Sequence, residues 1–195
     1  MSLAIIVGTR PQIIKTAPII KEMEARGLDF KLIHTGQHYD YELSQLFMEQ
    51  LGLPEPDINI GVGSGSSSYQ VGMMLIRLPK HIDNSSMVLV AGDTNSALGG
   101  ALAGAHLGIP VAHVEAGARC FDMKMTEEIN RRIIDHISTL LFAPTKNCEA
   151  HLRNEKAMGE IHLVGDTMFD SFLSFKRQVN HSRITEQLML KPNNY

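Results

Sequence analysis

Residues 87–132 read MVLVAGDTNSALGGALAGAHLGIPVAHVEAGARCFDMKMTEEINRR, and this stretch decides the fold. Met87–Ala91 is an unbroken apolar run, as expected of a strand that is buried on both faces of a parallel sheet. A helix of small residues is predicted over 96–107 and ends at Gly108. A second, mostly apolar run, 111–114, predicts the next buried strand. Two such strands joined by a helix indicate a βαβ unit.

The same alternation continues on both sides of this unit. Further strands are predicted over 3–7, 30–33, 140–143 and 161–164, and helices over 10–26, 41–51, 69–80, 127–137, 146–154 and 168–179. The predicted fold class is therefore α/β, a Rossmann-like, three-layer, doubly wound parallel sheet. We expect residues 1–181 to form this domain. Residues 182–195 combine an apolar helical spacing with a proline-containing connector, which predicts a helix and a hinge toward a second domain that the chain lacks.

Composition and charge exclude several classes of protein. The chain has 195 residues, of which 44% are hydrophobic and 20% charged, as in ordinary globular domains. A net charge of −3 argues against nucleic acid or an anionic membrane as a partner. Cys120 and Cys148 are too few for a disulfide framework, and no apolar run is long enough for a membrane span. These features predict a cytoplasmic protein.

Acidic residues follow the two central strands. Asp93 comes directly after the first strand and Glu115 directly after the second, and Glu127 begins the helix that follows. Because the carboxyl ends of neighbouring parallel strands meet at one edge of the sheet, we expect these acids to lie close together. Such a cluster suits proton transfer. Because Glu115 follows a mostly apolar strand, we expect it to be buried, which should raise its pKa toward that of a useful base. For Asp93 alone, a structural role as a helix cap is an equally good interpretation.

Two polar loops are candidates for substrate contacts. Arg10 stands at the start of a predicted helix, where its charge and the free backbone N–H groups would favour binding of an anion. The alternative interpretation is a solvated arginine in the first turn of the helix. Lys15 lies one turn further along the same helix. Gln37 and His38 follow the second predicted strand, where a capped turn is the alternative explanation.

A metal site is not predicted. His113-Val-Glu115 is reminiscent of the His-x-Glu of zinc deaminases, but that chemistry also needs a Pro-Cys-x-x-Cys motif, and Cys120 and Cys148 are far apart. Histidines beside apolar neighbours are more often hydrogen-bonded core residues than metal ligands.

The motifs taken together resemble one family. Their order is GTRPQIIK (8–15), TGQH (35–38), GDT (92–94), HVEAG (113–117), EEINR (127–131) and GDT (165–167). This joint pattern closely resembles the amino-terminal domain of the non-hydrolysing UDP-N-acetylglucosamine 2-epimerases. The resemblance implies one half of a GT-B-type, two-domain architecture with the active site between the domains. It also implies interconversion of UDP-GlcNAc and UDP-ManNAc through elimination and re-addition of UDP, without a cofactor.

The resemblance assigns roles to individual positions. It places Asp93, Glu115 and Glu127 as acid/base groups. It places Arg10 and Lys15 at the nucleotide-sugar, and puts Gln37 and His38 in a region that binds a second, activating UDP-GlcNAc in bacterial members.

Two positions depart from the family pattern, and we expect the family's second domain to be absent from this chain. Gln12 replaces a usual glutamate, and Thr126 replaces the usual proline before the acidic pair. The family's catalytic histidine belongs to the half that this chain lacks, so we expect the chain alone to have no meaningful epimerase activity. The alternatives are a stand-alone nucleotide-sugar-binding or dimerisation module, with a possible homodimer, and the acceptor domain of a GT-B glycosyltransferase.

Overall fold

The structure, a computed structural model, describes residues 2–37, 41–179 and 183–190. Within these residues, seven parallel strands form one sheet in the order β3-β2-β1-β4-β5-β6-β7. The strands are β1 (Leu3–Val7), β2 (Phe30–His34), β3 (Ile58–Asn59), β4 (Met87–Ala91), β5 (Val111–Val114), β6 (Leu140–Ala143) and β7 (Glu160–Leu163). The helices are α1 (Arg10–Ala25), α2 (Tyr41–Leu51), α3 (Ser67–Arg77), α4 (Pro79–Ile82), α5 (Asn95–His106), α6 (Thr126–Ile137), α7 (Lys146–Asn154), α8 (Thr167–Val179) and α9 (Ile184–Gln187). The predicted α/β class is confirmed.

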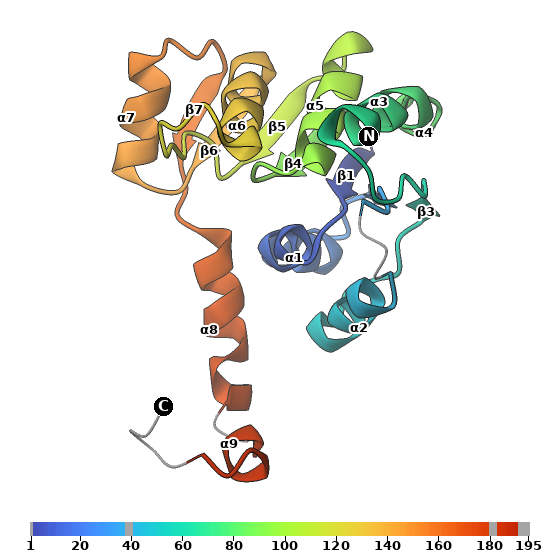
Figure 1. Ribbon diagram of the computed structural model, residues 1–195, viewed down its shortest axis with the longest axis vertical. Helices are drawn as coiled ribbons and strands as arrows, with labels where there is room; N and C mark the ends of the chain where they lie inside the picture. Colours follow the sequence, from blue (N-terminus) through green and yellow to red (C-terminus); the bar gives the residue numbers. More distant parts are fainter. Residues whose placement is uncertain (1, 38–40, 180–182, 191–195) are drawn as a thin grey trace.

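Helices cover both faces of the sheet and make three layers (Figure 1). Helices α3, α5, α6 and α7 lie on one face, and α1, α2 and α8 lie on the other. The strands alternate their side chains between the two cores, so that Ile6 packs with α5 while its neighbour Ile5 packs with α1. Burial on both faces is the reason that β1 and β4 read as continuous apolar runs and that β5 is apolar except for His113.

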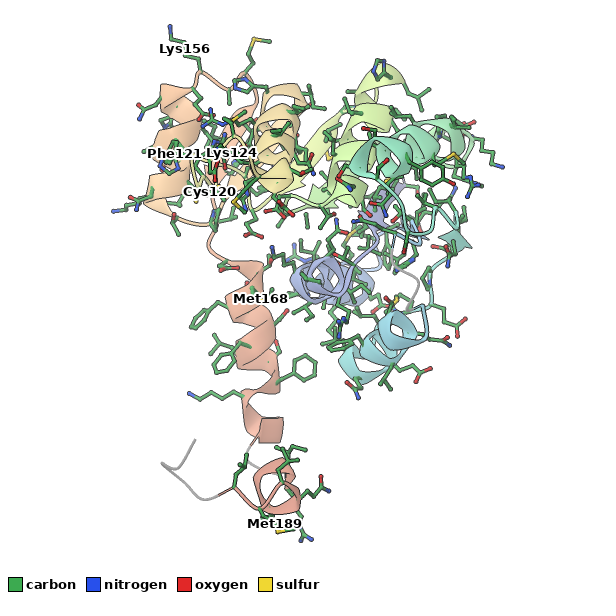
Figure 2. All side chains as sticks on the ribbon, in the orientation of Figure 1. Cys120, Phe121, Lys124, Lys156, Met168 and Met189 are labelled. Carbon is green, nitrogen blue, oxygen red and sulfur yellow. The ribbon has the colours of Figure 1, made fainter. Side chains whose placement is uncertain are left out.

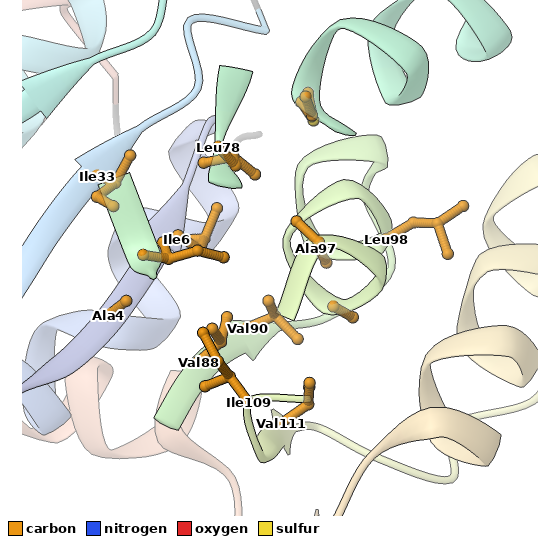
Figure 3. Close-up of a cluster of buried hydrophobic side chains, with 14 of the residues drawn as sticks. Ala4, Ile6, Ile33, Leu78, Val88, Val90, Ala97, Leu98, Ile109 and Val111 are labelled. Atoms are coloured by element: carbon orange, nitrogen blue, oxygen red, sulfur yellow. The ribbon is translucent and has the colours of Figure 1, made fainter. Parts of the chain in front are cut away.

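The core beneath α5 is built by residues that the sequence pattern assigned to the interior. Figure 3 shows Ile6, Val88, Val90 and Ala97 meeting between the sheet and this helix. The small residues of α5 let the helix approach closely, since a Cβ at Gly100 would lie 3.0 Å from Val90 Cγ1. This close approach fixes the start of α5 against the end of β4, where Asp93 lies.

Several predicted boundaries differ from the structure by one residue, and two predicted helices differ by more. The helix predicted over 69–80 is two helices, because Ser66 caps α3 two residues earlier and Pro79 starts α4. The helix expected in 182–190 is only α9, which ends because Met189 takes a left-handed conformation with φ 52°. The last strand begins at Glu160 rather than one residue later.

The first turn of α1 is held by Gln12 rather than by its cap residue. Thr9 occupies the cap position, but its side chain makes no capping hydrogen bond. Instead, Gly8 N–H donates to Gln12 Oε1 at 3.0 Å, and Gln12 Nε2 donates to the Ala91 carbonyl oxygen at 3.2 Å. A glutamine is therefore accommodated here, and it links the carboxyl ends of β1 and β4.

No helix in the described part of the chain combines the length and the apolar character that crossing a membrane requires.

The free energy of unfolding should fall when the pH drops from about 6.5 to about 4. Burial lowers the pKa of His34, at the end of β2, from 6.5 to about 4. Over this range the unfolded chain binds a proton that the folded chain does not, so acid favours unfolding by up to about 3 kcal/mol. Urea denaturation at a series of pH values measures this slope.

A His34→Asn variant should flatten that slope, since its side-chain oxygen can still accept the Gly36 N–H that His34 Nδ1 accepts at 3.0 Å. The same substitution at the exposed His106 is the matched control and should leave the slope unchanged. An equal slope in the His34 variant and the unsubstituted chain would refute this origin of the acid sensitivity.

Candidate active site at the carboxyl edge of the sheet

The strand order creates a crevice between β1 and β4. The chain builds outward from β1 to β2 and β3 on one side, and from β4 to β7 on the other. At such a switch point the loops leave in opposite directions, and ligands of open α/β sheets bind there. Asp93 and Glu115, which follow β4 and β5, both emerge at this edge.

A hollow of about 350 Å³ lies at this crevice. Its lining combines the loop after β1, the loop after β2, the start of α3, the start of α5 and the first turn of α6. The lining residues are Thr9, Pro11, Gln37, Ser67, Asp93, Thr94, Asn95, Thr126, Glu127 and Asn130. Of the predicted site residues, the structure thus brings Asp93, Glu127 and Gln37 around one space.

Asp93 is held from two directions. Its Oδ2 accepts hydrogen bonds from Arg131, at 2.8 Å from Nε and 2.5 Å from an Nη atom. Its backbone carbonyl accepts a hydrogen bond from Asn130 Nδ2 at 2.8 Å. Thr94, the next residue, caps α5 by accepting the Ala97 N–H. Asp93 therefore combines a fixed backbone with a carboxylate that faces both a guanidinium and the hollow.

The two adjacent glutamates of α6 have different environments. Glu127 is exposed and lines the hollow, whereas Glu128 is fully buried. Burial alone would raise the pKa of Glu128, but hydrogen bonds from Cys120, Arg132 and Arg131 outweigh it and lower this pKa to about 2. Glu128 is thus a permanent anion of the scaffold, and Glu127 remains the predicted acid/base group of the pair.

Glu115 lies over the end of β4 and forms an ion pair with Lys15. The sequence suggested a buried residue, but the Glu115 side chain is 32% exposed. Its backbone has φ 70°, a left-handed conformation that turns the chain away from β5. A Cβ at Gly92 would lie 3.2 Å from Lys15 Nζ and 3.7 Å from Glu115 Oε2, so this pair sits directly beside the residue that precedes Asp93.

The remaining predicted substrate contacts are spread along the same edge. Arg10 is exposed, and its guanidinium carbon lies 5.7 Å from the centre of the Phe47 ring on α2. Gln37 is buried, and its Oε1 accepts from Ser96 N–H at 3.0 Å and from Ser96 Oγ at 2.6 Å. His38 lies outside the described residues, so its predicted role is not tested.

A buried pair connects the two strand ends that carry acids. His113 Nδ1 lies 2.7 Å from Asp135 Oδ1, and His113 Nε2 lies 2.9 Å from the Gly92 carbonyl oxygen. Both ring nitrogens of His113 are thereby engaged in hydrogen bonds. In the described residues, no group of three or more histidine, cysteine, aspartate or glutamate side chains is arranged to hold a metal ion.

The Asp135 carboxylate also binds the loop after β5. Its Oδ2 accepts the Gly117 N–H at 3.1 Å and an Nη–H of Arg119, whose side chain is fully buried, at 2.7 Å. Burial alone would raise the pKa of Asp135, but the hydrogen bond from His113 and the charges of His113 and Arg119 hold it below its usual value.

Ion pairs of alternating sign run from the buried pair to the hollow. In order, the chain of contacts passes through His113, Asp135, Arg119, Glu155, Arg132, Glu128, Arg131 and Asp93. The loop between β5 and α6 follows this network, and Figure 2 shows its residues Cys120, Phe121 and Lys124 together beside α6 and α7. Sequence reasoning missed this network. Its one visible signal was Asp135, a charged residue next to the apolar Ile134 of α6.

The chain matches a family of known proteins. A family model described as UDP-N-acetylglucosamine 2-epimerase matches residues 21–195. A UDP-N-acetylglucosamine 2-epimerase homolog of Methanococcus maripaludis is 45% identical over 199 residues, which cover 100% of this chain and 56% of that protein. A UDP-2,3-diacetamido-2,3-dideoxy-D-glucuronate 2-epimerase of Pseudomonas aeruginosa is 42% identical, covering 91% of this chain and 52% of that protein.

A solved structure shares the fold over nearly the whole chain. The Methanocaldococcus jannaschii UDP-GlcNAc 2-epimerase, crystallised in complex with UDP-GlcNAc and UDP, superposes with a TM-score of 0.91 at 43% sequence identity. The match covers 96% of this chain and 53% of that one. The chain therefore spans about half the length of the relatives that it matches.

Proposed function

Because the chain belongs to the UDP-N-acetylglucosamine 2-epimerase family, we propose that it provides the acid-bearing wall of a site that epimerises UDP-GlcNAc at C2. In this reaction a base removes the C2 proton while the bond between C1 and the UDP oxygen breaks, giving 2-acetamidoglucal and UDP. Return of a proton to C2 on the opposite face, and of UDP to C1, gives UDP-ManNAc. The reaction needs two proton-transfer groups and cations near the diphosphate.

One observation carries this proposal: Asp93 and Glu127 border the same hollow from two different elements of the fold. Asp93 comes from the end of β4 and Glu127 from the first turn of α6. Carboxylates that approach one space from separate elements suit proton transfer on opposite faces of a sugar ring. Glu115, paired with Lys15 beside Gly92, is the third candidate acid/base group at this edge.

The diphosphate is assigned to the start of α1. A helix N-terminus presents free N–H groups to an anion, and Arg10 adds an exposed cation there. Lys15 follows one turn later and lies closer to the acids. On this basis we propose that the nucleotide lies on the α1 side and the sugar toward Asp93.

A second substrate is favoured by the 42% identity to the Pseudomonas aeruginosa enzyme. The sugar in that protein's name differs from GlcNAc by a second acetamido group and a carboxylate, and it is also changed at C2. Parallel titrations with the two UDP-sugars separate these proposals. The carboxylate of the second sugar would be repelled by Asp93 and Glu127 unless a cation accompanies it, so tighter binding of UDP-GlcNAc would favour the first substrate.

We expect UDP and UDP-GlcNAc to bind this chain, and Arg10→Ala to weaken both by about tenfold. Loss of one charge-assisted contact to phosphate costs roughly 1.4 kcal/mol, which corresponds to that factor. Asp93→Asn should leave UDP affinity nearly unchanged, because Asp93 is assigned to the sugar. Isothermal titration calorimetry measures all of these affinities.

Arg153→Ala is the matched control, since Arg153 is exposed and pairs only with Glu149 of its own helix among the described contacts. Absence of binding to the unsubstituted chain, or an unchanged affinity in Arg10→Ala, would contradict the proposal. Interconversion of UDP-GlcNAc and UDP-ManNAc by this chain alone, at a rate near that of a full-length relative, would overturn its assignment to one half of the site.

A further inference from the structure

Both strand ends that carry acids use strained or glycine-dependent turns. Gly92, before Asp93, has φ 68°, and Gly117, two residues after Glu115, has φ 81°. Glu115 itself has φ 70°, which costs a residue with a side chain about 1 kcal/mol or more. A conformation of this kind persists only where surrounding contacts hold it.

The same two buried side chains hold both turns. His113 donates from Nε2 to the Gly92 carbonyl oxygen, and Asp135 accepts the Gly117 N–H. The two side chains are joined to each other at 2.7 Å. One continuous path, from Gly92 through the imidazole and the carboxylate to Gly117, therefore ties the loop of β4 to the loop of β5.

The chemistry of the pair makes this path rigid. A carbonyl and a carboxylate both accept hydrogen bonds, so the ring of His113 donates from both nitrogens and has only one orientation. The His113 side chain is 1% exposed and that of Asp135 is not exposed at all. The neighbours of His113 in β5 are apolar, and apolar side chains at both positions would stabilise the core as well as an ion pair does.

We propose that His113 and Asp135 are positioning residues that set the places of Asp93 and Glu115 at the rim together. Neither touches the hollow, and each acts through the backbone of a turn. The consequence for activity rests on the proposed function, whereas the coupling of the two turns does not.

Three variants test the coupling by nuclear magnetic resonance on this chain. Asp135→Asn keeps the shape, because its amide can donate to a neutral His113 ring and its oxygen can accept the Gly117 N–H. Asp135→Ala and His113→Phe remove the link. Asp83→Ala, at an exposed position before β4, is the control.

In Asp135→Ala the amide signals of Gly92 and Asp93 should shift along with that of Gly117, although they lie on another strand. In Asp135→Asn these signals should stay near their original positions, while one of the two slowly exchanging ring N–H protons of His113 disappears. Affinity for UDP-GlcNAc should fall about tenfold in Asp135→Ala, the factor that corresponds to one lost contact of about 1.4 kcal/mol, and stay within about threefold in Asp135→Asn.

Unmoved Gly92 and Asp93 signals in Asp135→Ala, or equal displacement in Asp135→Asn, would overturn the proposal. If Asp135→Ala does not fold, the comparison of His113→Phe with Asp135→Asn tests the same coupling. The amide signals of both turns should then shift in His113→Phe and stay near their original positions in Asp135→Asn. Absence of UDP-GlcNAc binding to the unsubstituted chain would count against the proposed function alone, since the signals of the two turns still report whether they are coupled.

Discussion

Gly117→Ala should destabilise the chain by about 4 kcal/mol or more, which is at the extreme of single-substitution effects. A Cβ at this position would overlap the carbonyl oxygen of Cys148 and lie 2.9 Å from Leu152 Cγ. The first of these is a backbone atom at the start of α7, so no side-chain rotation relieves the overlap. The backbone φ of 81° adds a second cost.

Gly27→Ala separates the two costs. Gly27 has nearly the same conformation, with φ 63°, but nothing lies within 4 Å of the place where a Cβ would stand. This control should lose only about 1 kcal/mol, the conformational part. Thermal and urea denaturation measure both variants, and similar losses in the two would show that α7 moves aside at little cost.

Arg119→Met should cost about 3–5 kcal/mol, because it removes one partner of a buried ion pair and leaves the fully buried Asp135 carboxylate without that charge. The Arg119 side chain has no exposed surface, and it binds Asp135 at 2.7 Å and Glu155 at 2.6 Å. Methionine nearly preserves the length of the side chain, so the loss reports the charge rather than a large cavity. Urea denaturation at low and high salt measures it.

Arg153→Met provides the matched comparison on the surface. Arg153 and Glu149 form an exposed pair one helical turn apart, and such pairs contribute less than about 1 kcal/mol and weaken in salt. The effect of Arg119→Met should be several times larger and largely independent of salt. Equal losses in the two variants would contradict the structural importance of the buried network.

The elements that were predicted correctly are those whose sequence signal is local. Met87–Ala91 has to be apolar because the sheet buries it on both faces, and the cap and glycine around α5 lie within a few residues of its ends. The grouping of Asp93 with Glu127 followed from strand order. The exact order of the strands was not needed for this prediction, since the carboxyl ends of all strands in a parallel sheet lie on one edge.

The features that were missed depend on partners distant in the chain. Asp135 is 22 positions from His113, and Glu155 is 36 positions from Arg119, so neither spacing is a helix or strand period. The expectation that Glu115 is buried was wrong for the same reason. Its ion pair with Lys15 depends on how α1 packs, which the local sequence around Glu115 does not show. The start of α3 was predicted two residues too late, because Ser66 is only one of several neighbouring serines that were equally plausible caps.

The central position of β1 also determines when the domain can fold. Leu3 pairs with Met87, and Ile6 pairs with Val90, so β1 waits until β4 has been synthesised before the middle of the sheet closes. Until then its edge and one apolar face stay open to solvent, and pairings so distant in sequence form slowly. During synthesis, therefore, the same strand that anchors the finished sheet is the part most in need of protection from other chains.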